Sequence, residues 1–202
     1  MISVGVVDYG SGNLRSVCKA CEAVGASPSL INTRSQLAQH DAVIVPGVGS
    51  FGDCAANLRS TELWDPLVEW IKGENPTLGI CLGYQLLFDS SEESPGVQGL
   101  GILPGRVVRF LPEGRKVPHM GWNALLDTRG PLYVGLPTEP EVYFVHSYYP
   151  VPDDESTVSA SCEYGGRFAA SISCGALHAT QYHPEKSQSI GLSIFKNFLA
   201  TL

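Results

Sequence analysis

The chain has 202 residues, of which 44% are hydrophobic and 16% charged, so it is long and apolar enough to bury a core as a single domain over residues 1–202. A net charge of -7, with the cationic residues scattered, gives no basic surface, and we expect no nucleic-acid ligand. The N-terminus lacks a signal-peptide pattern and no apolar run has the length of a membrane span, so we predict a cytoplasmic protein with no membrane partner.

The first 80 residues predict strands that alternate with helices. Residues 2–8 are rich in Val and Ile and predict a buried strand, which a glycine-rich turn joins to a helix near Leu14. A long helical segment over 54–72 is interrupted or restarted near Pro66. Further strands are expected near 28–32, 42–45 and 77–81. This alternation implies a parallel sheet with helices on both faces.

Two of the six cysteines, Cys18 and Cys21, form a C-x-x-C pair. Such a pair is able to ligate zinc, but here it lies in a helical apolar stripe with Leu14 and Val17, and no second pair accompanies it. Structural zinc needs four ligands, so we expect these thiols to pack in the core. In a chain without an export signal we expect all six cysteines to be reduced, and we predict no metal and no other cofactor.

From Gly99 to Cys174 the pattern changes to short β-type runs separated by Gly and Pro turns, which predicts antiparallel hairpins. The expected runs are 106–111, 142–147, 158–163 and 167–173. The chain ends with a strand over 176–182 and a helix whose apolar residues share one face. The whole pattern predicts an α/β fold, a three-layer α/β/α arrangement with a mostly parallel central sheet and an added antiparallel β region.

Cys81 stands between Gly79 and Gly83, where an apolar strand changes to a helix. This arrangement is typical of a nucleophile elbow, because the glycines relieve crowding and the thiol is placed at the tip of the turn. The free N–H groups and positive dipole end of the helix favour the thiolate and are suited to bind an oxyanion. By this geometry the N–H of Leu82, directly after the nucleophile, is one candidate oxyanion donor.

A base for this nucleophile is expected at His183, and Glu185 is placed two residues later to orient the imidazole, with rigid Pro184 between them. Taken alone, a cysteine is more often a small buried hydrophobe and a histidine more often structural. The three residues together predict a Cys81–His183–Glu185 triad. In a parallel sheet the strand ends gather loops at one edge, so Val48, Cys81 and His183 are expected to meet there.

The motif GICLGYQ at 79–85 with HPE at 183–185 resembles the class I glutamine amidotransferases, which hydrolyse L-glutamine to supply ammonia. Tyr84 departs from a pattern in which a less polar residue is frequent. Four further segments, 8–14, 46–52, 118–123 and 143–148, are similar to one branch of the family, glutaminase subunits that serve a separate cyclase subunit in histidine biosynthesis. The resemblance implies that Cys81 attacks the glutamine amide while His183, held by Glu185, transfers protons.

The resemblance also implies roles for residues around the triad. The loop with Val48 and Gly49 would complete the oxyanion hole, and its rearrangement would switch the enzyme on. By motif, the substrate contacts are Gln85, Glu93, His146, Ser147 and Tyr148. For Glu93 the alternative is a solvated surface acid, and for His146 we slightly prefer a packed strand histidine.

A heterodimer with the cyclase is the implied assembly, and Asn13, Met120 and Trp122 are the predicted interface residues. A buried core pair is the alternative for Met120 and Trp122. The turn at 10–13 lacks the full spacing of a phosphate-binding loop, so we discount that interpretation. The alternatives to the main hypothesis are another class I amidotransferase, a Cys hydrolase acting on γ-glutamyl bonds, and a degenerate fold kept as a binding subunit.

Overall fold

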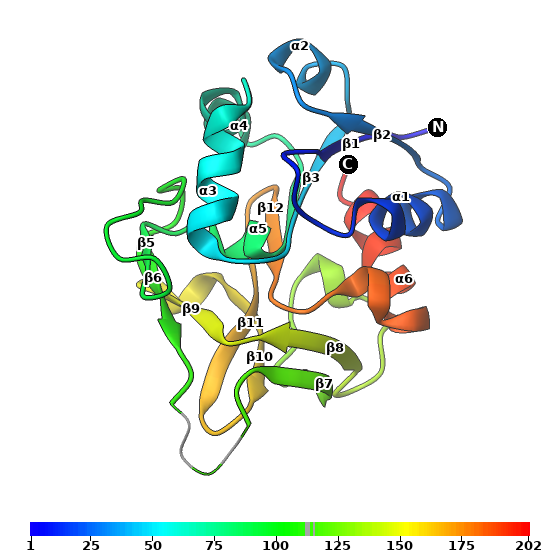
Figure 1. The fold of residues 1–202 in the computed structure, drawn as a ribbon. Helices are drawn as coiled ribbons and strands as arrows, with labels where there is room; N and C mark the ends of the chain where they lie inside the picture. The colour runs from blue at the N-terminus through cyan, green and yellow to red at the C-terminus, as the bar shows by residue number, and fades with distance from the viewer. Residues whose placement is uncertain (112–113, 115) are drawn as a thin grey trace.

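A computed structural model of the chain describes residues 1–111, 114 and 116–202 (Figure 1). Its central sheet has seven strands in the order β10-β11-β12-β4-β3-β1-β2. The strands from β12 to β2 run parallel, whereas β11 and β10 are antiparallel to their neighbours. The strands are β1 (Ser3–Val7), β2 (Ser27–Ile31), β3 (Ala42–Gly47), β4 (Thr77–Cys81), β10 (Val158–Glu163), β11 (Arg167–Cys174) and β12 (Leu177–Thr180). The predicted α/β fold with a mostly parallel sheet is confirmed.

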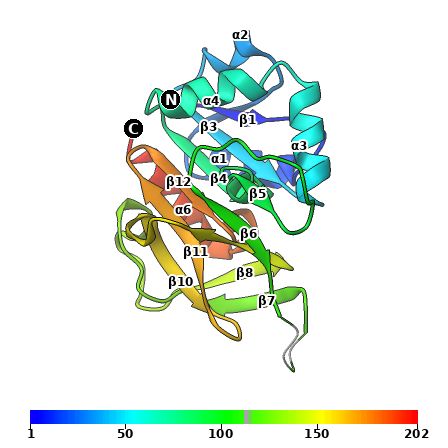
Figure 2. The ribbon, with the colours of Figure 1, turned by 90° about the vertical axis from the view of Figure 1, so that its left-hand side faces the viewer.

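Helices cover both faces of this sheet (Figures 1 and 2). One face carries α1 (Leu14–Ala23) and α6 (Gln188–Leu199), and the other carries α3 (Phe51–Ser60) and α4 (Trp64–Lys72). Two short helices, α2 (Arg34–Leu37) and α5 (Leu82–Gln85), complete the set of α-helices in the described residues. The helical segment expected over 54–72 is thus two helices, and the break precedes Pro66. Pro66 lies in the first turn of α4, where its missing N–H has no intrahelical partner to lose.

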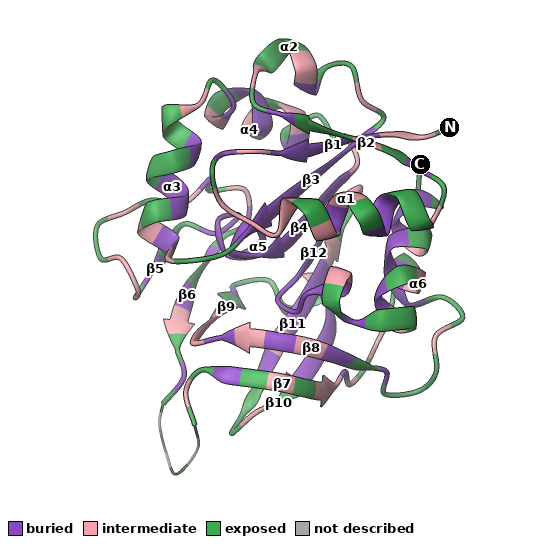
Figure 3. Ribbon diagram, turned by 45° about the vertical axis from the view of Figure 1, so that its right-hand side comes forward, coloured by how far each residue is buried: buried purple, intermediate pink, exposed green. Residues whose placement is uncertain are grey.

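The core lies between the central strands and their helices, as the burial colours show (Figure 3). Every residue of β3 and β4 is buried, because both strands have helices above and below them. Helix α1 buries Val17, Ala20 and Cys21, which recur at the spacing of one helical face. Cys21 therefore packs in the core, as predicted, and burial raises its pKa to about 12. All six cysteines are free thiols.

Two smaller sheets lie beside the central one. They form from β5 (Ser90–Ser91), β6 (Gly105–Arg109) and β9 (Tyr148–Pro152), and from β7 (His119–Ala124) and β8 (Glu141–His146). The expected antiparallel region is present, but not only as hairpins, because β6 pairs with the distant β9 and runs parallel to β5. The 3₁₀ helices are η1 (Pro131–Tyr133), η2 (Glu155–Thr157) and η3 (Pro184–Lys186). In the described residues, no helix has both the length and the apolar character needed to cross a membrane.

Candidate active site

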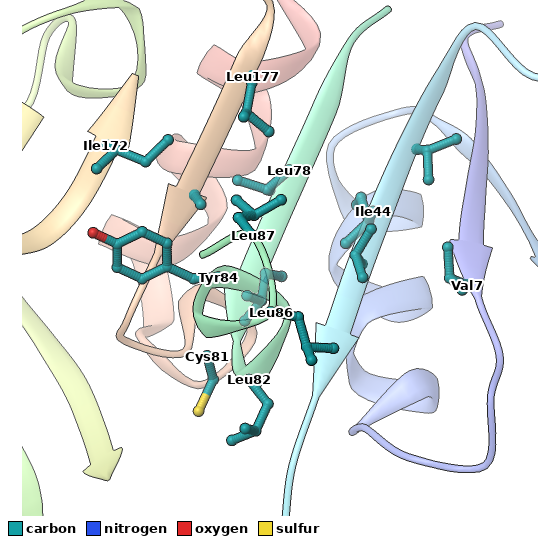
Figure 4. Close-up of a cluster of buried hydrophobic side chains, with 14 of the residues drawn as sticks. Val7, Ile44, Leu78, Cys81, Leu82, Tyr84, Leu86, Leu87, Ile172 and Leu177 are labelled. Carbon is teal, nitrogen blue, oxygen red and sulfur yellow. The ribbon is translucent and has the colours of Figure 1, made fainter. Parts of the chain in front are cut away.

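Cys81 ends β4 with φ 55° and ψ -108°, a left-handed backbone that a non-glycine residue rarely adopts. Helix α5 begins at the next residue and packs against β3. A Cβ on Gly83 would lie 1.8 Å from the carbonyl oxygen of Val45, so this close approach requires glycine. Figure 4 shows the Cys81 sulfur at the end of β4, pointing out of the apolar cluster. The sharp turn expected from the sequence is therefore formed, although α5 has only four residues.

His183 and Glu185 follow β12 and form a close pair. His183 Nδ1 lies 2.8 Å from Glu185 Oε1, and the two side chains are 2% and 1% exposed. Since a carboxylate accepts, Nδ1 carries the proton in this hydrogen bond. The other ring nitrogen, Nε2, is buried and has no hydrogen-bond partner among the described residues. This leaves Nε2 as the atom that is free to exchange a proton.

The pKa of His183 is set by opposing effects. Burial alone would lower it, because a charged ring loses its hydration. The neighbouring Cys81 and Glu185 act in the other direction and outweigh burial, so the pKa of His183 is raised to about 10. The imidazolium form of His183 is therefore stabilised near neutral pH.

A cavity of about 290 Å³ opens in front of this pair. All the predicted catalytic, oxyanion-hole and substrate residues line it except Glu185, which lies behind His183. The lining residues are Val48, Gly49, Cys81, Leu82, Gln85, Glu93, Pro118, Val145, His146, Ser147, Tyr148 and His183. Pro118 and Val145 were missed, although both belong to the segments 118–123 and 143–148 that carry the family resemblance. The volume suits a ligand of amino-acid size.

Gln85 lines this cavity and is held in place by two hydrogen bonds from its amide nitrogen. Nε2 donates to the carbonyl oxygen of Tyr148 and to Oε1 of Gln181, both at 3.0 Å. Gln181 Nε2 in turn donates to Cys81 Sγ at 3.7 Å. The Oε1 of Gln85 is buried without a hydrogen-bond partner in the described part of the chain. Sequence reasoning missed Gln181, for which the only signal was its place two residues before His183.

Glu93 is not a solvated surface acid. Its Oε2 accepts the backbone N–H of Phe51 at 2.7 Å, and the next residue, Ser94, accepts the N–H of Gly52 through its hydroxyl at 3.0 Å. Both bonds satisfy N–H groups in the first turn of α3. Glu93 therefore holds the segment that follows the Val48 loop while also lining the cavity.

The Val48 loop is held by Ser11. The backbone N–H of Val48 donates to Ser11 Oγ at 3.2 Å, and the Ser11 hydroxyl donates to the Val48 carbonyl at 2.5 Å. The next residue, Gly49, has φ 105°, a conformation that favours glycine. In this conformation the Val48 N–H is engaged and does not serve an oxyanion.

The predicted interface residues lie outside the cavity. Met120 is 62% exposed and Trp122 46% exposed on β7, which contradicts the alternative of a buried core pair. Asn13 is partly exposed directly before α1. Exposed Met and Trp side chains on one strand are typical of a protein interface.

A larger groove of about 510 Å³ lies elsewhere, along β9, β10 and β11. It contains no cysteine and no histidine among the residues that line it. Its Arg129 already donates to backbone carbonyls, and its Arg167 pairs with Asp127. Size alone therefore does not make it the reaction site, and the chemistry favours the smaller cavity at Cys81.

The sequence pattern of the family described as "Glutamine amidotransferase class-I" matches residues 5–202. The chain belongs to this family. It is therefore a glutamine amidotransferase enzyme, which confirms the predicted family and enzyme class.

Relatives of this amidotransferase include "Imidazole glycerol phosphate synthase subunit HisH" of Syntrophotalea carbinolica, 48% identical over 96% of this chain and 97% of the relative. The protein of the same name from Geobacter sulfurreducens is 46% identical over 98% of each. Among solved structures, "Structure of PurLQS from Thermotoga maritima" has a TM-score of 0.79 at 20% identity and covers 99% of both chains. "Crystal structure of glutamine amidotransferase" has a TM-score of 0.76 at 22% identity, covering 98% of this chain and 97% of the other. These structures support the fold.

Proposed function

We propose that this chain is the glutaminase subunit of imidazole glycerol phosphate synthase in cytoplasmic histidine biosynthesis, acting as one domain over residues 1–202. The two relatives described above, each named as a subunit of imidazole glycerol phosphate synthase, are 48% and 46% identical over nearly the whole chain. The observation that carries the chemistry is the cavity in which Cys81 and the free Nε2 of His183 meet, with Glu185 hydrogen-bonded behind the ring. The substrate is L-glutamine, and the products are glutamate and ammonia.

The reaction begins with the Cys81 thiolate, which attacks the side-chain amide carbon of glutamine while the C=O electron pair moves onto oxygen. When the tetrahedral intermediate collapses, the C–N bond breaks and imidazolium His183 gives its Nε2 proton to the departing ammonia. A thioester on Cys81 remains. Neutral His183 then takes a proton from water as the water attacks the thioester, and glutamate leaves as the thiolate is restored. Glu185 keeps the ring oriented and stabilises its charged form.

The oxyanion requires hydrogen-bond donors placed before the reaction starts. Leu82 supplies one N–H directly after the nucleophile, where a helix start leaves N–H groups free. The second donor comes from the loop with Val48 and Gly49. Because Ser11 engages the Val48 N–H, this donor is released only when the loop rearranges. The isolated chain is therefore a slow glutaminase, and it is activated when the partner and its nucleotide bind.

Recognition of free glutamine relies on the charged end of the amino acid. Glu93 faces the α-ammonium, and the backbone of Ser147 and Tyr148 serves the α-carboxylate, with His146 holding that segment. Gln85 lines the same cavity and contacts the substrate there. These contacts distinguish glutamine from a glutamine residue within a protein, which carries neither charge.

Ammonia has to reach its acceptor without entering bulk water, because near neutral pH it would become ammonium, which is not a nucleophile. The partner is therefore a cyclase subunit that forms a heterodimer with this chain and contacts Asn13, Met120 and Trp122. It uses the ammonia to form imidazole glycerol phosphate and aminoimidazole carboxamide ribonucleotide.

The test is a reconstituted assay with the cyclase subunit and its nucleotide substrate. Glutamine should support product formation with the parent chain, whereas Cys81→Ala should abolish this and leave cyclisation from added ammonium salts intact. Omitting the cyclase should lower glutamine hydrolysis. Equal hydrolysis with and without the cyclase would refute the coupling, and glutamine-dependent product with Cys81→Ala would refute the nucleophile.

A further inference from the structure

The carbonyl oxygen of Tyr148, at the start of β9, accepts two side-chain hydrogen bonds. One comes from Gln85 Nε2 at 3.0 Å and the other from His146 Nδ1 at 2.9 Å. A backbone carbonyl only accepts, so both side-chain atoms that face it must be N–H donors. This one group therefore determines the orientation of an amide and the tautomer of a ring.

The Tyr148 carbonyl determines the orientation of the two amides that lead to Cys81. Gln85 presents the same Nε2 to Gln181, so the Gln181 atom that receives it must be the acceptor, Oε1. The remaining amide atom of Gln181, Nε2, is then the one that faces Cys81 Sγ at 3.7 Å. Gln181 is completely buried and so does not exchange this contact for water. It donates to the sulfur and cannot accept from a thiol, which favours the thiolate.

The Tyr148 carbonyl also determines the tautomers of two histidines that lead from the cavity to β7. His146 carries its proton on Nδ1, so its Nε2 is a bare acceptor, and His119 Nδ1 lies 3.1 Å from it. His119 therefore donates through Nδ1 and leaves its own Nε2 as an acceptor. Asn123 Nδ2 lies 3.3 Å from that nitrogen. Because His119 Nε2 is an acceptor, the Asn123 atom that faces it must be an N–H donor.

Independent contacts at the far end require the same arrangement. Asn123 Nδ2 donates to the carbonyl of Glu163 at 3.0 Å, and its Oδ1 accepts the N–H of Ala124 at 2.9 Å. The amide orientation is thus fixed from β7 without reference to the cavity, and it agrees with the orientation derived from Tyr148. Two backbone carbonyls therefore impose one set of tautomers on the rings between them.

Both rings are neutral in this network. Burial lowers the pKa of His119 to about 4 and that of His146 to about 3, and the ring of His119 stacks on Tyr164 with centroids 3.9 Å apart. A proton on either ring would place a second N–H against a group that is already a donor. The buried pair therefore holds the tautomers that the two carbonyls impose.

We infer that the Tyr148 carbonyl, acting through Gln85, orients Gln181 so that its amide donates a hydrogen bond to the Cys81 thiolate. Gln181 is then a further residue at the reacting sulfur. The same carbonyl holds His146, and through it His119, in the form protonated at Nδ1. The inference rests on the proposed function only for its role in glutamine hydrolysis, because the state of the sulfur is measurable without glutamine.

The tautomers are tested on the unaltered protein by nitrogen NMR of its histidine rings at pH 7, with assignment by single substitutions. We expect both His119 and His146 to be neutral and protonated at Nδ1. A ring protonated at Nε2, or one carrying two protons, would overturn the network. The signals that decide the question belong to the parent chain, and the substitutions serve only to assign them.

The effect on the sulfur is tested by the rate of Cys81 alkylation with iodoacetamide as a function of pH, with the site identified by mass spectrometry. Gln181→Met keeps the volume of the side chain and removes the N–H that faces Cys81. The midpoint of the alkylation rate against pH should then move upward by about one pH unit, since hydrogen bonds to charged groups are the stronger ones. The other titratable groups that interact with Cys81 are His183, Tyr9 and Cys54, and every variant retains them.

Variants at position 119 are the controls for packing. His119→Asn and His119→Gln both lose the ring stacking, but the Tyr148 carbonyl still accepts from Gln85 in each of them. We therefore expect a near-parental midpoint of Cys81 alkylation with both variants. An upward shift with either variant equal to that of Gln181→Met, or no shift with Gln181→Met, would refute the inference. A chain with this shift but no cyclase-coupled glutaminase activity would instead refute only the proposed function.

Discussion

The close approach of α5 to β3 predicts that Gly83→Ala damages both stability and catalysis. A Cβ at this position would lie 1.8 Å from the Val45 carbonyl oxygen and 2.8 Å from its carbon, and both are backbone atoms of a buried strand. Ordinary contacts of this kind are about 3.4 Å or longer, so α5 or β3 has to move by roughly 1.5 Å. Overpacking of this kind costs about 1–3 kcal/mol. That loss corresponds to a Tm decrease of roughly 2–12 °C in a chain of this size.

The same displacement moves Cys81 and Leu82, since α5 begins directly after Cys81. A misplacement of about 1 Å is expected to reduce kcat/KM on the order of 100-fold. Thermal unfolding and cyclase-coupled glutaminase kinetics measure the two effects. Gly79→Ala is the matched control, because its nearest contacts would be 3.1 Å and it should be milder in both assays. Parental Tm and kcat/KM in Gly83→Ala would refute the steric reasoning.

Three other predictions concern the loop, the triad and acid stability. Ser11→Ala removes the acceptor of the Val48 N–H and should raise glutamine hydrolysis by the chain without the cyclase; unchanged ammonia release would show that Ser11 does not restrain the loop. Glu185→Gln keeps an acceptor for His183 Nδ1 but removes the negative charge, so the pKa of His183 should fall from about 10. The kcat should drop on the order of 10² to 10⁴. Both effects are measured by pH-rate profiles, and an unaltered kcat would contradict the prediction. Burial lowers the pKa values of His119, His146 and His178 to between about 3 and about 4. Histidine titrates near 6.5 in the unfolded chain, which therefore binds more protons than the folded chain between these values. The contribution of the three neutral rings to the free energy of unfolding is thus complete above pH 6.5 and is lost as pH falls toward 4. Urea midpoints should fall over this range, and His178→Asn should reduce the fall; the same slope in both chains would contradict this.

Local sequence patterns determined most of the secondary structure. The apolar runs of β1 and β4 are each long enough for one buried strand, and their ends agree with the prediction to within a residue or two. The predicted interruption or restart near Pro66 is confirmed, because α4 begins at Trp64 and places the proline in its first turn, where proline is compatible with a helix. The pairing of β6 with β9 was not predictable, because it joins segments about 40 residues apart.

The sequence by itself determined which residues are the candidates for the site, because its strongest signals are local: Cys81 between two glycines, and His183 two residues from Glu185. It also identified the segments that line the cavity. Only the tertiary structure decided that Ser11 engages Val48 and that Gln181 faces the sulfur. Such contacts join side chains and backbone groups that are 37 and 100 residues apart, and they depend on how strand ends meet at one edge of the sheet. A local pattern specifies which residue type is present, whereas the partner of each polar group is set by what the folded chain brings within hydrogen-bond distance.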